Sequence, residues 1–299
     1  MADLTPAVSP TMNTEDTATP FVAVPTSTYN FAELAEIYNH TRVDYIVPMP
    51  MNARRMEAYV RSYDVDLDAS AVVLDRAGVM LGLGMLGVRN DRAWITRLGV
   101  VPERRGKNLG IFLMEHLLNG ARERNARLVQ LEVIKGNIPA HRLFRKLGFN
   151  ETRELLVVRR PPGKPVIPQP VPDVQVTPLN RDEILKCLEE RGEAASWLDE
   201  NRSLVHLDGL KGLCVQFPSG ESGWVAYESS LIQMAYVTVH TPPHVRDTMT
   251  LALLYHLHDL HPMLDTKVEN LPALDLRWPI FQQMGYMETF RRVEMFLYY

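Results

Sequence analysis

The stretch from Ile95 to Phe149 restricts the folds open to this chain more than any other part. Its pattern predicts an apolar strand, a basic turn, an amphipathic helix, a second strand and a short second helix. In the long helix, Leu109, Leu113 and Leu117 lie on one apolar stripe that must pack on a sheet. The stretch therefore predicts a βαβ crossover.

The basic turn in this stretch is suited to a bound phosphate group. Arg104, Arg105 and Lys107 cluster around Gly106, and the backbone amides that open the following helix have no partners within it. Amides, helix dipole and cations together suit a di- or triphosphate. The turn does not fit a P-loop, because Asn108 replaces the Ser or Thr that would hold magnesium.

Length and composition predict a two-domain globular protein of 299 residues. Residues 1–20 hold few large apolar side chains, which predicts a flexible tail. No apolar run reaches the roughly 20 residues of a membrane helix, and the first residues show no signal pattern. We therefore expect a cytoplasmic protein with no membrane partner.

Charge is placed unevenly along the chain. Residues 1–160 hold 21 Lys and Arg against 18 Asp and Glu, and residues 161–299 hold 11 against 18. A modest positive charge gathered at one turn favours an anionic cofactor over a nucleic-acid partner, which would need a broad basic face.

Metal and disulfide chemistry find no support in the sequence. Cys187 and Cys214 lack the spacing of a zinc site or a disulfide framework. His256, His258 and His261 lack the i, i+4 spacing that aims two imidazoles at one ion. We expect two ordinary buried thiols and no metal.

The rest of the first half predicts an α/β sheet with helices on both faces. We expect an opening strand and two helices, a three-stranded antiparallel meander that runs into the basic turn, and a final strand after the short helix. The predicted elements lie at 21–25, 30–41 with Asn30 as its cap, 52–63, 71–74, 79–88, 93–101, 128–134, 139–147 and 152–158.

A connector with six prolines at 161–172 marks the expected domain boundary. Beyond it the order of elements echoes the first half. The predicted elements lie at 181–190, 212–216, 223–227, 231–240, 245–260, 266–268, 279–284 and 290–298.

Two motifs in the stretch from Ile95 to Phe149 resemble the GNAT superfamily of CoA-dependent N-acyltransferases. The family's Q/R-x-x-G-x-G/A loop corresponds to Arg105 through Gly110, and its N-x-x-A-x-x-L-Y-x-K-x-G-F pattern corresponds to Asn137 through Phe149. The second half is similar to a degenerate copy without the R-G-x-G signal, in which Pro242 and Pro243 remove amide donors from the turn.

This resemblance implies two tandem GNAT-like domains, each a mixed, mostly antiparallel twisted sheet flanked by helices. A tail at 1–20 would precede a CoA-binding domain at 21–160, a linker at 161–174 and a degenerate domain at 175–299. We expect the second copy not to bind CoA in the family manner.

The resemblance also implies a site for acetyl-CoA, the co-substrate. Backbone groups of Leu98 and Val100 would bind the pantetheine arm, and the turn would hold the pyrophosphate. The expected cofactor-binding residues are Leu98, Val100, Arg105, Gly106, Lys107, Asn108, Leu109, Gly110, Asn137 and Phe144.

Three residues bear on the chemistry. Glu132 matches a glutamate that acts as general base in the family's ribosomal-protein N-terminal acetyltransferases. A strand glutamate that faces solvent or pairs with an arginine is an open alternative. Asn108 replaces the loop's first glycine but tolerates a left-handed backbone. Phe144 replaces the family's frequent tyrosine, the usual acid for the thiolate.

Two functions fit these residues. The first is direct acetyl transfer from acetyl-CoA to a primary amine of a small molecule or peptide. The alternative, motivated by Phe144 and Asn108, is a non-catalytic acyl-CoA-binding or regulatory module. The acidic second half favours a cationic amine as acceptor, but the sequence carries no indication of its identity or of the oligomeric state.

Overall fold

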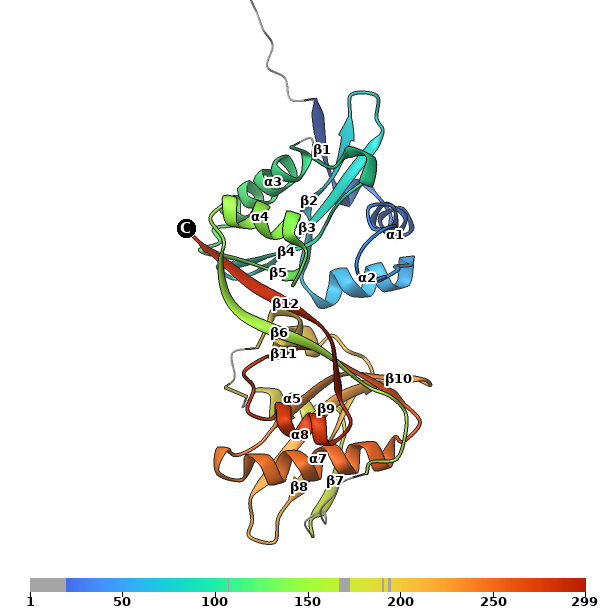
Figure 1. Cartoon of the computed structure of the whole chain (residues 1–299), viewed down its shortest axis with the longest axis vertical. Coiled ribbons are helices and arrows are strands. Elements are labelled where there is room, and N and C mark those ends of the chain that lie inside the picture. Colours follow the sequence, from blue (N-terminus) through green and yellow to red (C-terminus); the bar gives the residue numbers. More distant parts are fainter. Residues whose placement is uncertain (1–19, 107, 167–172, 190, 193–194) are drawn as a thin grey trace, which may run out of the picture.

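The computed structural model describes residues 20–299 except 107, 167–172, 190, 193 and 194. The described residues form one twelve-stranded sheet, flanked by helices, that runs through both halves of the chain (Figure 1). The expected mixed, mostly antiparallel sheet is therefore confirmed. The expected tail at 1–20 and the middle of the connector lie outside the described residues, apart from residue 20.

The first half contains the elements expected from its pattern. Most ends shift by a few residues, but the strand expected at 71–74 begins six residues earlier, at Val65. Asn30 caps the first helix in a capping box with Glu33. The elements are β1 (Phe21–Pro25), α1 (Phe31–His40), α2 (Ala53–Ser62), β2 (Val65–Asp75), β3 (Met80–Arg89), β4 (Arg92–Val100), α3 (Leu109–Glu123), β5 (Leu128–Ile134), α4 (Ile138–Lys146) and β6 (Asn150–Arg160).

The second half repeats this order. Three of its elements were not expected from the sequence. These are the strand β7 (Gln175–Leu179), the 3-10 turn η3 (Trp197–Asp199) and the short helix α6 (Asn201–Leu204). The others are α5 (Arg181–Glu189), β8 (Leu210–Gln216), β9 (Ser222–Ser229), β10 (Gln233–His240), α7 (Arg246–Leu260), β11 (Asp265–Pro272), α8 (Trp278–Gln283) and β12 (Met287–Tyr298).

The two halves exchange their last strands. The strand order is β1-β2-β3-β4-β5-β12-β6-β11-β10-β9-β8-β7. β12 lies beside β5, with Val293 opposite Val133, and β6 lies beside β11, with Val158 opposite Val268. In Figure 1, β6 and β12 run together as a twisted pair from the upper to the lower part of the molecule. The end of each half therefore completes the sheet of the other.

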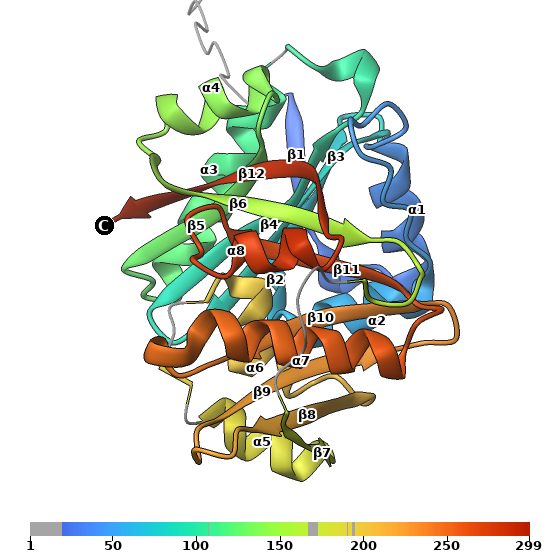
Figure 2. The same ribbon diagram turned by 60° about the horizontal axis from the view of Figure 1, so that its bottom comes forward.

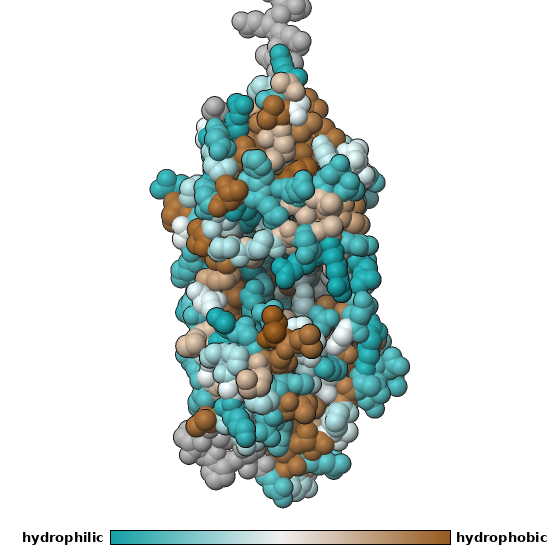
Figure 3. Space-filling model, turned by 90° about the vertical axis from the view of Figure 1, so that its right-hand side faces the viewer, coloured by the Kyte–Doolittle hydropathy of each residue, from teal (hydrophilic) through white to brown (hydrophobic). Residues whose placement is uncertain are grey.

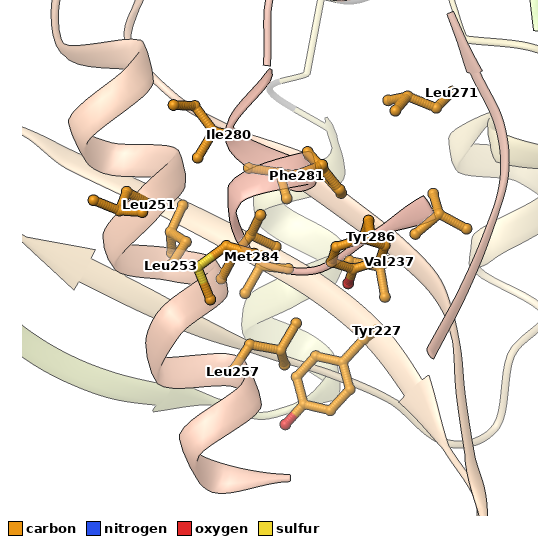
Figure 4. Packing of buried hydrophobic residues seen from close by; sticks show 14 of the residues in the cluster. Tyr227, Val237, Leu251, Leu253, Leu257, Leu271, Ile280, Phe281, Met284 and Tyr286 are labelled. Atoms are coloured by element: carbon orange, nitrogen blue, oxygen red, sulfur yellow. The ribbon is translucent and has the colours of Figure 1, made fainter. Parts of the chain in front are cut away.

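Helices cover both faces of the sheet. In the first half, α3 packs on one face and α1 with α2 on the other. In the second half, α7 crosses the face of the neighbouring strands (Figure 2). Figure 4 shows the core beneath it, where Leu253 and Leu257 of α7 face Phe281, Met284 and Tyr286. This burial of apolar surface supplies most of the stability of both halves.

A segment of the second half is docked into the core of the first. The Trp197 ring stacks on Trp94 with 5.8 Å between centroids and is fully buried. Arg89, also buried, donates to the Trp197 carbonyl at 3.0 Å and pairs with Asp64 at 2.7 Å and Glu200 at 2.9 Å. A buried guanidinium is destabilising unless it is paired and hydrogen-bonded, so these contacts hold the halves in one arrangement.

The domain limits expected from the sequence stay a prediction, but the strand order says how to test them. A fragment of residues 20–160 lacks β12, so one edge of β5 and the apolar side chains that meet Val293 and Met295 lose their cover. We expect this fragment to self-associate and to unfold without a cooperative transition, measured by light scattering and circular dichroism.

A peptide of residues 286–299 added in trans should restore a cooperative transition. The same peptide with Val293→Asp, which places a charge in the core, should not. A monomeric, cooperatively folded 20–160 fragment would contradict the expectation.

Candidate active site

The site opens where two parallel strands diverge. β4 pairs with β5 only from Arg92 to Ile95 and from Leu128 to Leu131. Two residues later, Arg97 has φ +51° and makes a bulge in β4. A bulge redirects the strand, so the backbone beyond it has no neighbour on the β5 side. This opening holds the backbone of Leu98 and Val100, the residues expected to meet the pantetheine arm.

Two arginines occupy the carbonyls of this opening. Arg42 Nη2 donates to the Leu98 carbonyl at 3.0 Å, and Arg105 Nε donates to the Val100 carbonyl at 3.1 Å. Arg105 also pairs with both oxygens of Asp44, at 2.6 and 2.7 Å. Arg105 therefore lies at the mouth of the opening, but in this state its guanidinium is held by a carboxylate.

The basic turn has the geometry of an anion site. Gly106 has φ +78° with nothing within 4 Å of a built Cβ, and Asn108 has φ +61°, the left-handed conformation that asparagine tolerates. No side chain of the described residues caps α3. Lys107 lies outside the described residues. The amides that open α3 are therefore available to a ligand.

The remaining expected cofactor residues lie around this turn with different roles. Leu109 is buried in the core, and a Cβ on Gly110 would come within 3.2 Å of Leu143. Asn137 caps α4 by accepting from the Ala140 amide at 3.4 Å, and Phe144 is buried beside it. Asn137 and Phe144 line the cavity described next, whereas Leu109 serves packing.

A cavity of about 1040 Å³ adjoins the opening and is walled by both halves of the chain. The first half supplies Thr96, Arg97 and Glu132, and the second supplies Asp199 and Tyr236. Figure 3 shows hydrophilic residues over much of the mid-height of this side of the molecule. The size suits a small organic molecule or the end of a peptide.

Glu132 is a carboxyl group of this cavity, and it follows directly after Leu131, the last residue of β5 that pairs with β4. Its Oε2 accepts from Trp94 Nε1 at 2.9 Å, and its Oε1 is buried without a hydrogen-bond partner. Burial raises the pKa of Glu132 to about 7, while the charge of Arg292 and the Trp94 hydrogen bond act to lower it. A carboxyl with a pKa near neutrality and a free oxygen can exchange a proton with a ligand.

Several cavity residues were not identified from the sequence. Arg97 Nη1 donates to the Tyr38 hydroxyl at 2.9 Å, and its guanidinium lies 4.0 Å from the Tyr59 ring centroid. The Tyr59 hydroxyl is 2.5 Å from Thr96 Oγ1. Only the unusual place of an arginine within an apolar strand could have indicated Arg97. The residues from the second half carry no local signal.

The second half has the same strand divergence, but it is filled. β10 pairs with β11 only at Gln233 and Met234, and Tyr236 makes the bulge with φ +56°. Arg277 donates to the carbonyl of Val239, which lies three residues after the bulge. In the first half, Val100 has the same place after its bulge and accepts from Arg105. Asp275 holds this guanidinium with contacts of 2.9 and 2.7 Å.

Two of the three clustered histidines of the second half form hydrogen bonds, and the third, His256, lies against the Tyr255 ring. His258 Nε2 lies 3.0 Å from the Tyr286 hydroxyl, and burial lowers the pKa of His258 to about 3. His261 Nε2 lies 2.8 Å from the Tyr227 hydroxyl. Both rings therefore serve as neutral hydrogen-bonding groups of the fold.

A family model matches part of the first half. Residues 33–149 match the model of the acetyltransferase (GNAT) family. The match covers the strand opening, the basic turn and Glu132. No helix of the described residues is both long and apolar enough to cross a membrane.

The matched relatives are acetyltransferases named for different acceptors. The chain is 33% identical over 78 residues to the ribosomal protein bS18-alanine N-acetyltransferase of Escherichia coli (strain K12), covering 26% of this chain and 53% of the relative. It is 43% identical over 60 residues to the streptothricin acetyltransferase of Streptomyces lavendulae, covering 20% and 32%. The chain thus spans about half or less of the length of these relatives.

Solved structures extend the likeness to both halves. A GCN5-related N-acetyltransferase from Sphaerobacter thermophilus superposes with a TM-score of 0.70 at 17% identity, covering 93% of this chain and 96% of that one. A tandem GNAT protein from the clavulanic acid biosynthesis pathway gives 0.64 at 15% identity, covering 93% and 98%. The tandem GNAT-like fold expected from the sequence is confirmed.

The contact between Arg105 and Asp44 yields a test of the turn as a phosphate site. Asp44 and a pyrophosphate would compete for the same guanidinium, so Asp44→Asn should tighten CoA binding about two- to fivefold by titration calorimetry. Glu288→Gln, which removes an exposed carboxylate paired with Arg291 elsewhere, is the matched control and should change nothing. Weaker CoA binding in the Asp44 variant would show that Asp44 supports the turn instead.

Proposed function

We propose that the protein is an N-acyltransferase that moves an acetyl group from acetyl-CoA to a primary amine without a covalent enzyme intermediate. The observation that carries this proposal is Glu132, a carboxyl group with a free oxygen in a cavity beside the strand opening of a GNAT fold. The acceptor is a small-molecule or peptide amine that enters the cavity between the two halves.

The cofactor site would use the opening and the turn. The amides at the start of α3, with Arg105, would hold the pyrophosphate, and the backbone of Leu98 and Val100 would bind the pantetheine arm. Phe144 and Asn137 would border the thioester end, because both line the cavity. Acetyl-CoA supplies the activated acyl group when bound.

The chain's own chemistry is proton transfer and positioning. The carboxylate of Glu132 takes one proton from the acceptor's ammonium group, which frees the nitrogen lone pair for attack on the thioester carbon. The C–N bond forms, the C–S bond breaks, and the second proton lost by the nitrogen goes to the departing thiolate. Phe144 has no proton to give, but a thiolate is a stable enough leaving group to depart without a side-chain acid.

One cofactor per chain follows from the second half's filled opening. Arg277 occupies the Val239 carbonyl, and Pro242 and Pro243 remove amide donors before α7. The second half would therefore serve as a wall of the acceptor cavity.

The alternative is a non-catalytic acyl-CoA-binding or regulatory module. Thiol release from acetyl-CoA across a panel of amines separates the two functions. The relatives suggest peptides that begin with alanine and streptothricin as members of the panel. Saturable CoA binding with no thiol release on any amine favours the module.

Replacing the proposed base tests the chemistry. Glu132→Gln keeps the shape and the Trp94 hydrogen bond but cannot take a proton, so kcat/KM should fall about 10²- to 10⁴-fold. In the natural protein, kcat/KM should fall as the pH drops below about 7, because the carboxyl becomes protonated, and this limb should be absent in the variant. Glu151→Gln, an exposed carboxyl on β6, is the control. An unchanged rate in Glu132→Gln would remove Glu132 from the reaction.

A glycine pair tests the number of cofactor sites. Gly106→Glu puts a carboxylate at the phosphate turn and should abolish CoA binding, which in the natural protein should saturate at one CoA per chain. Gly78→Glu is the matched control, since Gly78 also has positive φ and open space around it. Residual stoichiometric binding to the Gly106 variant would reveal a site in the second half.

A further inference from the structure

One half-buried carboxyl group of the cavity has no role in the function proposed so far. Asp199 belongs to η3 of the second half, yet it lines the same cavity as Glu132. Its Oδ2 accepts from Ser196 Oγ at 3.0 Å. Burial raises the pKa of Asp199 to about 7. A carboxyl group in such surroundings is unfavourable for folding. Groups of this kind gather at functional sites, where they serve a ligand.

The same pair of rings holds Asp199 and Glu132 in place. Trp94 donates to Glu132, and its ring stacks on Trp197, which lies two residues before Asp199. Trp197 is itself fixed, because its Nε1 donates to the Tyr63 carbonyl at 3.0 Å. The docked segment thus delivers a carboxyl group of the second half to the cavity that holds the proposed base.

The nearest cations already have partners. Arg292 donates to Glu269 at 2.7 Å and to Asn270 Oδ1 at 2.7 Å, and Lys267 pairs with Glu269 at 2.5 Å. These charges lower the pKa of Glu269 to about 2. Glu269 is therefore ion-paired, whereas Glu132 and Asp199 line the same cavity without an ion pair of their own among the described contacts.

Charged groups reach Asp199 from each neighbouring element. Arg191, after α5, and Arg292 on β12 lower the pKa of Asp199, and Glu269 on β11 raises it. The charge of Asp199 in turn raises the pKa of Glu132 on β5. A positive charge bound between the two carboxyl groups would lower the pKa of both and favour their charged forms.

We propose that Asp199 is a positioning residue of the acceptor site, which holds the acceptor's ammonium group so that its nitrogen faces Glu132. This inference rests on the proposed function. It implies that the acceptor amine binds as an ammonium cation. It also gives the second half a direct part in substrate recognition. The bound ammonium group favours the charged form of Asp199, and the proton moves to Glu132.

The test uses the full-length chain with Asp199→Asn, in which the amide can still accept from Ser196. With alaninamide as acceptor, KM should rise about 10- to 100-fold with kcat changed less than about threefold, as expected for a lost charged hydrogen bond. The acidic limb of kcat/KM should move to lower pH, because the charge that raises the pKa of Glu132 is gone. Asp247→Asn, an exposed carboxyl on α7 paired with Arg246 and outside the cavity, should change neither value.

Calorimetry in saturating CoA separates this inference from the proposed function. Alaninamide should bind the Asp199 variant at least tenfold more weakly than the natural protein, whereas lactamide, which lacks the ammonium group, should bind both alike. If no amine is acetylated but this difference in binding is found, the transferase function fails and the role of Asp199 stands. Equal alaninamide binding, absent binding to the natural protein, or an unmoved acidic limb overturns the role.

Discussion

The exchange of β6 and β12 is the interaction on which the rest of the structure depends. Because β12 inserts beside β5, it brings Arg292 next to the strand that carries Glu132. Because β6 inserts beside β11, the sheet continues without an edge into the second half. The cavity is therefore walled by both halves as a consequence of strand order, and its electrostatics belong to neither half alone.

The carboxyl groups of the site destabilise the native state near neutral pH, and the rest of the fold must offset this cost. An unfolded Glu or Asp titrates near pH 4, but burial raises the pKa of Glu132 and Asp199 to about 7. For a carboxyl group with a raised pKa, the native state binds the proton more tightly, so stability falls as the pH rises through the window from about 4 to 7. The Trp94 and Trp197 stack and the buried Arg89 network lie beside these groups and offset that cost.

The sequence was informative where the signal is local. The stripe of Leu113 and Leu117, the cap at Asn30 and the turn at Gly106 each depend on residues a few positions apart, and the expected elements are found there. The exchange of β12 could not be predicted, because the apolar pattern of a strand does not identify which distant strand it pairs with or in which register. Asp199 was missed for the same reason, because η3 gains its place from Trp94, more than a hundred residues earlier.

The two strand openings show how tandem copies of one fold can diverge in function. In both, an arginine held by an aspartate donates to the carbonyl three residues after the bulge. The Arg105 and Asp44 side chains are 44% and 49% exposed, whereas those of Arg277 and Asp275 are 14% and 7% exposed. An exposed pair is weak and exchanges readily for a phosphate, but a buried pair cannot be separated without leaving a charge uncompensated. The first pair can therefore release its guanidinium to an anionic ligand, whereas the second pair keeps its guanidinium on the Val239 carbonyl.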